Sequence, residues 1–142
     1  MAQGMLVGDV IGGRQRRWDD RAIPAVCFTD PEIMSVGLSV ADVESQSTAP
    51  VVGLYPFAAN GSAQTLGQTD GVVQVVADSD HVVLGIHAAG PRASELAGEA
   101  TLAIEMGATL EDLALTVRAH PTLSEVVQEA AAAALIVSAR GE

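Results

Sequence analysis

Residues 71–88 read GVVQVVADSDHVVLGIHA, and this stretch decides the fold. Two valine-rich runs, 71–77 and 82–88, flank the short polar segment Asp78-Ser-Asp-His81. Valine-rich runs on either side of a short polar turn predict a β-hairpin. Because both faces of each run carry apolar residues, we expect the hairpin to lie inside a sheet with both faces largely covered.

Weaker strand patterns lie N-terminal to the hairpin, at 25–28, 35–38 and 51–57. Turn-forming residues follow the first and last of them, at Thr29-Asp-Pro-Glu32 and Asn60-Gly61. Two helices are expected in the same half of the chain: one over 2–12, closed by Gly12-Gly13, and a short one capped by Ser39 and ending near Ser45.

After Gly90-Pro91 the apolar spacing becomes helical, and it continues to Gly107, which ends a helix. Thr109-Leu-Glu-Asp112 and Thr122-Leu-Ser-Glu125 follow the capping-box pattern, so they predict the starts of two more helices, the last running to about Val137. Strands first and helices last indicate one α+β domain. We expect an antiparallel sheet of about four to five strands with helices packed on it.

Charge and composition exclude several classes of function. The 142 residues carry a net charge of -11, which would repel a nucleic acid. The basic cluster Arg14-Gln-Arg16-Arg17 precedes Asp19 and Asp20, and we expect a solvated link there. No apolar run approaches the roughly 20 residues needed to cross a bilayer, so no membrane partner is expected. A single cysteine, Cys27, and the lack of a leader pattern at the N-terminus favour a cytoplasmic location.

One histidine stands in a suggestive setting. His120 precedes Pro121 at an expected chain corner, and Glu125 falls in the first turn of the helix that follows. A carboxylate that holds one ring nitrogen fixes the histidine tautomer and stabilises the imidazolium, so the pair could act as a general acid/base. Thr-x-x-Glu is also a common helix start, and spacing alone leaves both roles open for Glu125.

Four separated segments carry a resemblance to a known family. His120-Pro-Thr-Leu-Ser-Glu125 resembles the His-Pro-Thr-x-x-Glu signature of the pyridine nucleotide-disulfide oxidoreductases. Their C-terminal dimerisation (interface) domain is similar in three further segments: Arg21-Ala-Ile-Pro-Ala-Val-Cys-Phe-Thr-Asp-Pro-Glu32, Ser35-Val-Gly37 and Leu84-Gly-Ile-His-Ala-Ala-Gly-Pro-Arg-Ala-Ser-Glu95. The last of these points to the dihydrolipoamide dehydrogenase branch.

The resemblance implies a division of the chain and a role for the histidine. Residues 1–20 would be a remnant of the preceding FAD-domain helix with its linker, and 21–142 the dimerisation domain of a homodimer. His120 and Glu125 would act in the partner subunit's active site, accepting a proton from dihydrolipoamide. The backbone of His120 and Pro121 would contact the partner's FAD, and their peptide bond would be cis.

The resemblance also implies what lies outside this chain. FAD and NAD would serve the full-length enzyme, whose other partner would be the lipoyl-bearing acyltransferase of a 2-oxo acid dehydrogenase complex. Neither the family's redox pair, two cysteines separated by four residues, nor a Gly-x-Gly-x-x-Gly occurs here, so we expect no cofactor on this chain and no activity alone. Many relatives have a second histidine where this chain has Arg118, and we expect little effect from that difference.

The remaining candidates have plainer interpretations. His87 is expected to be packed or interfacial, His81 to be solvated in its turn, and Cys27 to be a buried apolar residue. The histidines lack metal-ligand spacing, so no metal is expected. An alternative to the enzyme fragment is a stand-alone, non-catalytic binding module derived from this domain.

Overall fold

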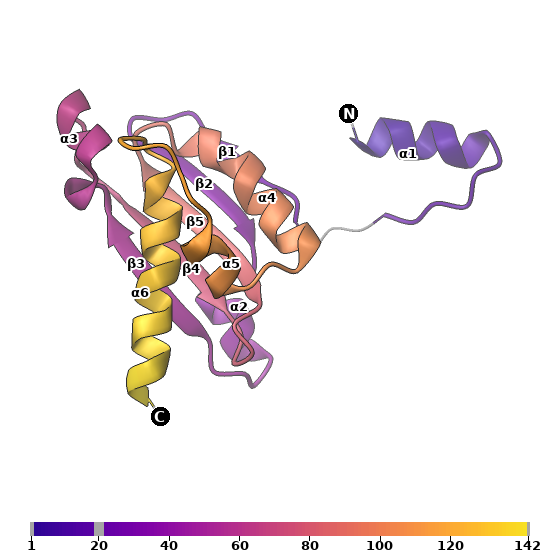
Figure 1. Ribbon diagram of the computed structural model, residues 1–142. Coiled ribbons are helices and arrows are strands. Elements are labelled where there is room, and N and C mark those ends of the chain that lie inside the picture. Colours follow the sequence, from indigo (N-terminus) through magenta and orange to yellow (C-terminus); the bar gives the residue numbers. More distant parts are fainter. Residues whose placement is uncertain (1, 19–21, 142) are drawn as a thin grey trace.

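A five-stranded antiparallel sheet lies at the centre of the computed structural model, which describes residues 2–18 and 22–141 (Figure 1). The strands are β1 (Ala25–Cys27), β2 (Glu32–Gly37), β3 (Val51–Pro56), β4 (Val72–Ala77) and β5 (Val83–Gly90). Their spatial order is β1-β2-β5-β4-β3, and every neighbouring pair is antiparallel. The predicted α+β class and strand number are confirmed, and the hairpin of β4 and β5 is central.

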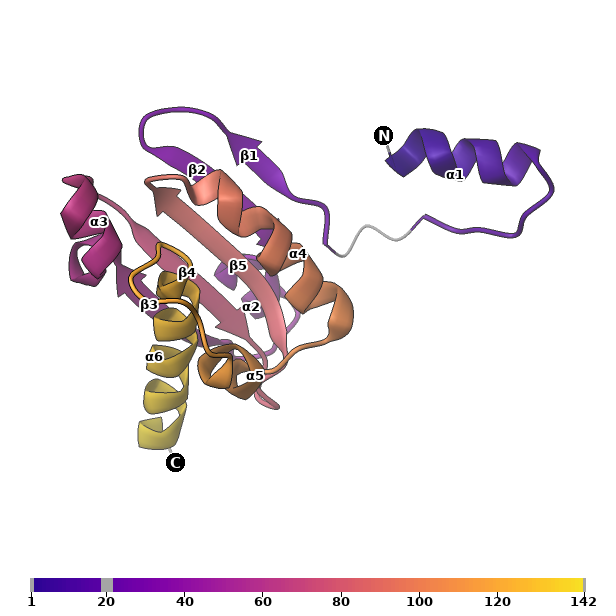
Figure 2. The same ribbon diagram turned by 45° about the horizontal axis from the view of Figure 1, so that its top comes forward.

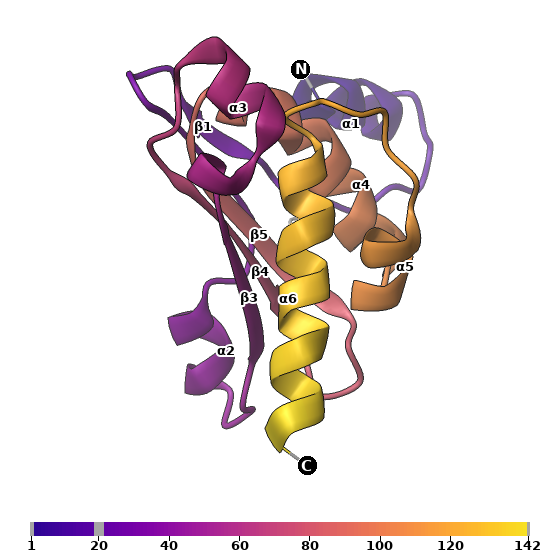
Figure 3. The ribbon, with the colours of Figure 1, turned by 60° about the vertical axis from the view of Figure 1, so that its left-hand side comes forward.

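Helices cover one face of this sheet. The α-helices are α1 (Ala2–Ile11), α2 (Val40–Ser45), α3 (Gly61–Leu66), α4 (Ala97–Met106), α5 (Leu110–Leu115) and α6 (Glu125–Gly141), with 3-10 turns at Phe57–Ala59 and Ala93–Leu96. α4 packs on β2 and β5, while α6 packs on β3 and β4 (Figure 2). α2 lies on the other side of the sheet (Figure 3).

The last helix sits unusually close to the sheet because both surfaces are built from small residues. Ala130, Ala131 and Ala134 on α6 are all buried, and Ala130 and Ala134 lie against Gly53 on β3. A Cβ at Gly53 would lie 2.0 Å from the Ala130 carbonyl oxygen. No side chain fits there, so glycine lets the helix backbone rest directly on the strand and fixes the position of Glu125 at the helix start.

The opposite face of the sheet corrects the prediction that both faces would be covered. Side chains that point toward the helices, such as Val73, Val75 and Ile86, are buried. On the other face of the hairpin, Val72 is exposed and Gln74 and Ala89 are only partly buried. The exposed side chains of Ile33 on β2 and Leu54 on β3 lie beside them. The valine-rich runs predicted the central position of the hairpin correctly. An apolar side chain alone does not reveal whether the same chain covers it.

Cys27 is exposed, not buried as its apolar neighbours suggested. It lies on the edge strand β1 opposite Ile33, on the open face of the sheet. Asn60-Gly61, predicted as a turn, instead begins α3: the Asn60 side-chain oxygen accepts a hydrogen bond from the Ala63 N–H at 2.9 Å. Asparagine serves turns and helix N-caps through the same kind of hydrogen bond, which explains the error.

β2 begins at Glu32, three residues earlier than predicted. Glu32 pairs with Gly90 of β5, and its carboxylate accepts a hydrogen bond from the Ser94 N–H at 2.9 Å. The Ser94 hydrogen bonds also hold the pKa of the Glu32 carboxyl below its ordinary value. These contacts are made by residues about 60 positions away, so local sequence could not show them.

α1 ends close to the predicted glycine stop, with Gly13 in the left-handed conformation at φ 84°. It stands apart from the sheet and its covering helices (Figures 1 and 2). Asp9 pairs with Arg14 and Arg16, so the basic cluster is partly neutralised within this segment. The predicted domain boundary at residues 20 and 21, with Asp19 and Asp20, lies outside the described residues. None of the described helices is long and apolar enough to span a membrane.

Candidate functional site

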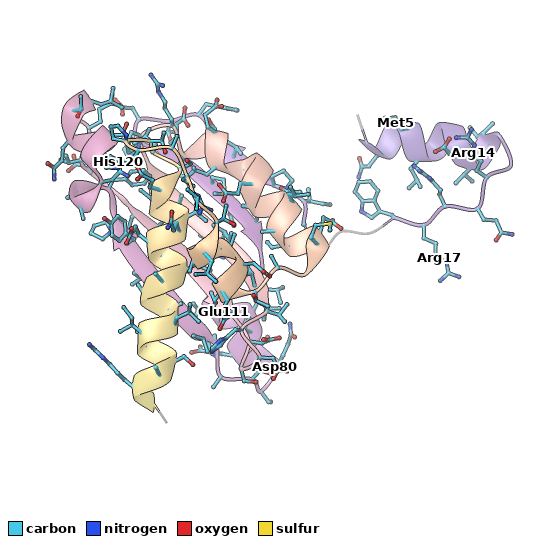
Figure 4. All side chains as sticks on the ribbon, in the orientation of Figure 1. Met5, Arg14, Arg17, Asp80, Glu111 and His120 are labelled. Atoms are coloured by element: carbon cyan, nitrogen blue, oxygen red, sulfur yellow. The ribbon has the colours of Figure 1, made fainter. Side chains whose placement is uncertain are left out.

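The predicted corner at His120 lies in the connection between α5 and α6, at the end of the domain where α6 begins (Figure 4). The His120–Pro121 peptide bond is cis, as predicted. The His120 side chain is 77% exposed, so its ring stands out from the domain surface. The backbone before and after it is held by hydrogen bonds of neighbouring residues.

Glu125 makes both of the contacts that the sequence left open. Its Oε1 lies 2.8 Å from Nδ1 of His120, and its Oε2 accepts a hydrogen bond from the Thr122 N–H at 2.7 Å. The Thr122 hydroxyl donates to the Ala119 carbonyl oxygen at 2.8 Å, so the threonine half of the expected capping box is used differently. One carboxylate therefore ties the helix start to the histidine ring.

The electrostatics of the pair favour an ionised glutamate. The hydrogen bond from the Thr122 N–H, followed by the one from the His120 ring, lowers the pKa of Glu125, and nearby Arg118 adds a smaller effect in the same direction. An ionised carboxylate can only accept hydrogen bonds. Nδ1 of His120 must therefore carry the hydrogen, and the neutral ring presents the lone pair of Nε2.

That second ring nitrogen is open. Among the described residues, neither Nε2 of His120 nor its backbone carbonyl oxygen has a hydrogen-bond partner. An exposed nitrogen that can accept a proton, backed by a carboxylate, is the arrangement that general base catalysis requires. A free carbonyl oxygen beside it can accept a hydrogen bond from a ring N–H of a bound molecule.

Asn60 and Arg118, to which the sequence analysis gave no role in the site, hold this corner in place. The Asn60 amide donates to the Thr122 carbonyl oxygen at 3.0 Å, and Asn60 is only 4% exposed. The Arg118 guanidinium donates to the Leu113 and Thr116 carbonyl oxygens at 3.0 Å and pairs with Glu99 of α4. For Asn60, the available sequence signal was that asparagine is a favoured N-cap residue, here of a helix that begins at Gly61.

The other two histidines have both ring nitrogens occupied. Nδ1 of His81 lies 2.7 Å from Glu111 of α5, and Nε2 lies 3.0 Å from the hydroxyl of Ser138 on α6. His81 is thus tied into the structure, contrary to the expectation of a solvated turn residue. His87 is packed as predicted: its Nε2 lies 3.0 Å from the Leu38 carbonyl oxygen, and its Nδ1 2.8 Å from the Ser35 hydroxyl.

The Ser138–His81–Glu111 arrangement has the residue types of a hydrolytic triad but not its surroundings. Ser138 lies within α6, where backbone N–H groups are bonded to carbonyl groups one turn back and cannot stabilise an oxyanion. Within residues 2–18 and 22–141, no group of three or more His, Cys, Asp and Glu side chains could hold a metal ion.

Comparison with known families identifies the domain. The family described as "Pyridine nucleotide-disulphide oxidoreductase, dimerisation domain" matches residues 23–131, which is most of the chain. The chain belongs to this family. The resemblance read from the four sequence segments is thereby confirmed, and the dimerisation domain includes both the sheet and the His120 corner.

Relatives of this dimerisation domain carry a consistent name. This chain is 52% identical over 134 residues to the dihydrolipoyl dehydrogenase of Halobacterium salinarum, and the match covers 94% of this chain and 28% of that protein. The Pseudomonas aeruginosa dihydrolipoyl dehydrogenase is 50% identical over 136 residues, covering 95% and 29%. The chain therefore spans less than a third of the length of these curated relatives.

Solved structures agree with the fold. LpdA from Mycobacterium tuberculosis superimposes with a TM-score of 0.84 at 29% identity, covering 92% of this chain and 29% of that one. A flavoprotein disulfide reductase, RclA from Escherichia coli, reaches 0.83 at 21% identity, covering 90% and 30%, and shows the same fold.

Proposed function

We propose that this chain is the dimerisation domain, residues 21–142, of a flavin-dependent dihydrolipoyl dehydrogenase, with residues 1–20 belonging to the preceding helix and linker. The observation that carries the proposal is the exposed His120 ring, which has Nδ1 held by Glu125 at 2.8 Å and Nε2 open. In a homodimer this ring is supplied to the active site of the partner subunit. Alone, the chain is inactive.

The proposed chemistry is a proton transfer. Nε2 of His120 accepts the proton of a dihydrolipoamide thiol, and the S–H bond breaks to leave a thiolate. The thiolate attacks one sulfur of the redox disulfide on the partner subunit, because a thiolate and not a thiol is the nucleophile. A mixed disulfide forms as the original S–S bond breaks, and the other cysteine sulfur leaves as a thiolate. Glu125, kept ionised by its lowered pKa, holds the ring in the reactive tautomer and stabilises the imidazolium that forms.

FAD and NAD would bind to other domains of the intact enzyme, where they supply electron transfer from the dithiol. The residues present here fit a contact with a flavin ring. The carbonyl oxygen of His120 has no hydrogen-bond partner among the described residues and lies beside the cis Pro121 at an exposed corner. His120 and Pro121 would thus meet the partner's FAD through their backbone.

The proposed setting is a cytoplasmic homodimer that works with the lipoyl-bearing acyltransferase of a 2-oxo acid dehydrogenase complex. The exposed apolar side chains of Ile33, Leu54 and Val72 line one hollow on the open face of the sheet. Such residues on a soluble surface are typical of a region that a partner covers. This supports an interface within a larger, paired molecule.

A chimeric enzyme tests the proposal. Residues 23–142 would replace the corresponding segment of the Pseudomonas aeruginosa dihydrolipoyl dehydrogenase, which is 50% identical over the matched region. We expect the chimera to form dimers, bind flavin and oxidise dihydrolipoamide, and the His120→Gln chimera to do only the first two. A fully active His120→Gln chimera would overturn the proposed role, and a flavin-free monomer would favour a stand-alone binding module.

A further inference from the structure

The connection that carries His120 is irregular, yet it is anchored from two sides. Residues 116–124 lie between α5 and α6. A segment without regular backbone hydrogen bonds keeps a fixed shape only when side chains satisfy its polar groups. Two polar side chains do this on either side of the histidine: Asn60, which comes from another part of the domain, and Arg118, which lies in the connection itself.

The first anchor is Asn60. It is the only buried polar or charged residue within the described parts of the chain, at 4% exposed, and both ends of its amide are used. The oxygen caps α3 through the Ala63 N–H at 2.9 Å, and the nitrogen donates to the Thr122 carbonyl oxygen at 3.0 Å. The N–H of Thr122 in turn binds Glu125 at 2.7 Å. Thr122 therefore links Asn60 to Glu125, the glutamate that holds the His120 ring.

The second anchor is Arg118, whose side chain is only 7% exposed. One guanidinium nitrogen donates to two carbonyl oxygens, of Leu113 at the end of α5 and of Thr116 just beyond it. The other pairs with Glu99 on α4. A planar guanidinium can satisfy these separate acceptors at once, which a compact ammonium group does less well. Arg118 thus fixes the chain two residues before His120.

We infer that Asn60 and Arg118 are positioning residues, which together aim the open ring nitrogen of His120 by holding the backbone on both sides of it. The inference rests on the proposed function only for its catalytic consequence. The sequence predicted little effect from arginine at 118, but its contacts give it a structural task there. Neither residue reaches Nε2 or the exposed face of the ring.

The consequence for a proton transfer follows from geometry. Reacting groups must meet within a narrow range of distance and angle, and a displacement of about 1 Å costs up to about 100-fold in rate. Without the Asn60 amide, the Thr122 carbonyl loses a buried partner, and the Thr122–Glu125 hydrogen bond weakens with it. Without Arg118, the Leu113 and Thr116 carbonyl oxygens lose their donor, and Glu99 loses its partner.

The test is carbon-13 NMR titration of the Glu125 carboxyl in the intact 142-residue chain. Asn60→Ser keeps a good helix cap for α3 but is too short to bind the Thr122 carbonyl. Arg118→Met keeps the apolar stem and removes the donors. Ser39→Ala, which removes the equivalent cap of α2, is the matched control for a lost N-cap. Arg118→Lys is a conservative variant that keeps the charge.

The hydrogen bond from Thr122 is the foremost cause of the lowered Glu125 pKa, and the charge of Arg118 adds a smaller effect in the same direction, so Asn60→Ser and Arg118→Met should both raise this pKa toward its ordinary value of 4.5. Ser39→Ala should lower the overall stability and leave the Glu125 pKa in place, and Arg118→Lys should fall between Arg118→Met and the wild type. An unchanged Glu125 pKa in both Asn60→Ser and Arg118→Met, whatever their stability, overturns the inference.

Activity in the chimeric enzyme separates this inference from the proposed function. With Asn60→Ser or Arg118→Met we expect kcat for dihydrolipoamide to fall about 10- to 100-fold, with dimer and flavin retained. Raised Glu125 pKa values without any loss of kcat would refute the catalytic consequence and leave the structural role intact. Loss of kcat with an unmoved Glu125 pKa would contradict the positioning role itself.

Discussion

His120 and His81 both place a ring Nδ1 against a glutamate, at 2.8 Å from Glu125 and 2.7 Å from Glu111. The two pairs lie toward opposite ends of the domain (Figure 4). α6 takes part in both, since Glu125 starts it and Ser138 lies 13 residues on, about 20 Å along the axis. The same helix thus supports two histidine–carboxylate pairs with the same contact.

The difference lies in the second ring nitrogen. The Ser138 hydroxyl occupies Nε2 of His81, whose side chain is 27% exposed, whereas Nε2 of His120 has no partner among the described residues and its side chain is 77% exposed. His81 joins the β4–β5 turn, α5 and α6, so its hydrogen bonds serve stability. A histidine–glutamate contact therefore does not mark a proton-transfer site unless one nitrogen remains open to a substrate.

The largest expected effect separates the two histidines by activity. In the chimeric enzyme, His120→Gln should lower kcat for dihydrolipoamide by about 100- to 10,000-fold, because a general base is lost. His81→Gln should leave kcat within about twofold. Steady-state assays with dihydrolipoamide and NAD measure both. Equal losses from the two variants would erase the distinction between an open and an occupied nitrogen.

The next largest effect is expected from a substitution that should disturb both histidine–glutamate pairs at once. Gly53→Ala puts a methyl group 2.0 Å from the Ala130 carbonyl oxygen and pushes α6, which carries Glu125 and Ser138, away from β3. We expect a loss of about 3 kcal/mol or more in the free energy of unfolding, measured by urea denaturation.

Gly98→Ala on α4 is the matched control. Its Cβ would meet nothing within 4 Å, so alanine should be neutral or stabilise the helix by roughly 0.5–1 kcal/mol. If Gly53→Ala were equally well tolerated, the close approach of α6 to the sheet would not be what positions the two sites.

These packing contacts also mark how far sequence reasoning reached. Valine-rich runs and capping signals predicted the hairpin and the later helices, and the spacing of His120 and Glu125 allowed their contact, because each depends on residues close in sequence. The Asn60–Thr122 and His81–Ser138 hydrogen bonds join residues 62 and 57 positions apart. No local pattern encodes such pairs, so the positioning contacts of Asn60 and the structural role of His81 could be recognised only from the folded structure.

A smaller effect is expected on stability, where His81 should matter more than His120. His81 has φ 64°, a conformation that asparagine also tolerates, so His81→Asn removes the ring without adding backbone strain. It should cost about 1–2 kcal/mol in the free energy of unfolding, because two hydrogen bonds are lost, one of them partly buried. His120→Asn should cost less than about 0.5 kcal/mol. Urea unfolding that ranks them the other way would contradict the proposed division of roles.

The smallest expected effect is on acid stability. Hydrogen bonds hold the pKa of Glu125 and of Glu111 below the ordinary value of 4.5. Each group is therefore more acidic when folded than when unfolded, so its contribution to stability is present above about pH 4.5 and is lost as the pH falls through the folded pKa. Glu125→Gln and Glu111→Gln should each flatten the fall of the urea midpoint in this range. Slopes identical to the wild type would show that neither pair contributes to the loss of stability at acid pH.

The most direct test of the central claim, that His120 serves the partner subunit, is the activity of a mixed dimer. One chimeric subunit lacks the redox cysteines and keeps His120, and the other keeps the cysteines and carries His120→Gln. Each homodimer should be inactive, while the purified mixed dimer should have one complete site and about half of the parental kcat per dimer. A mixed dimer as inactive as its two parents would mean that His120 does not act across the interface.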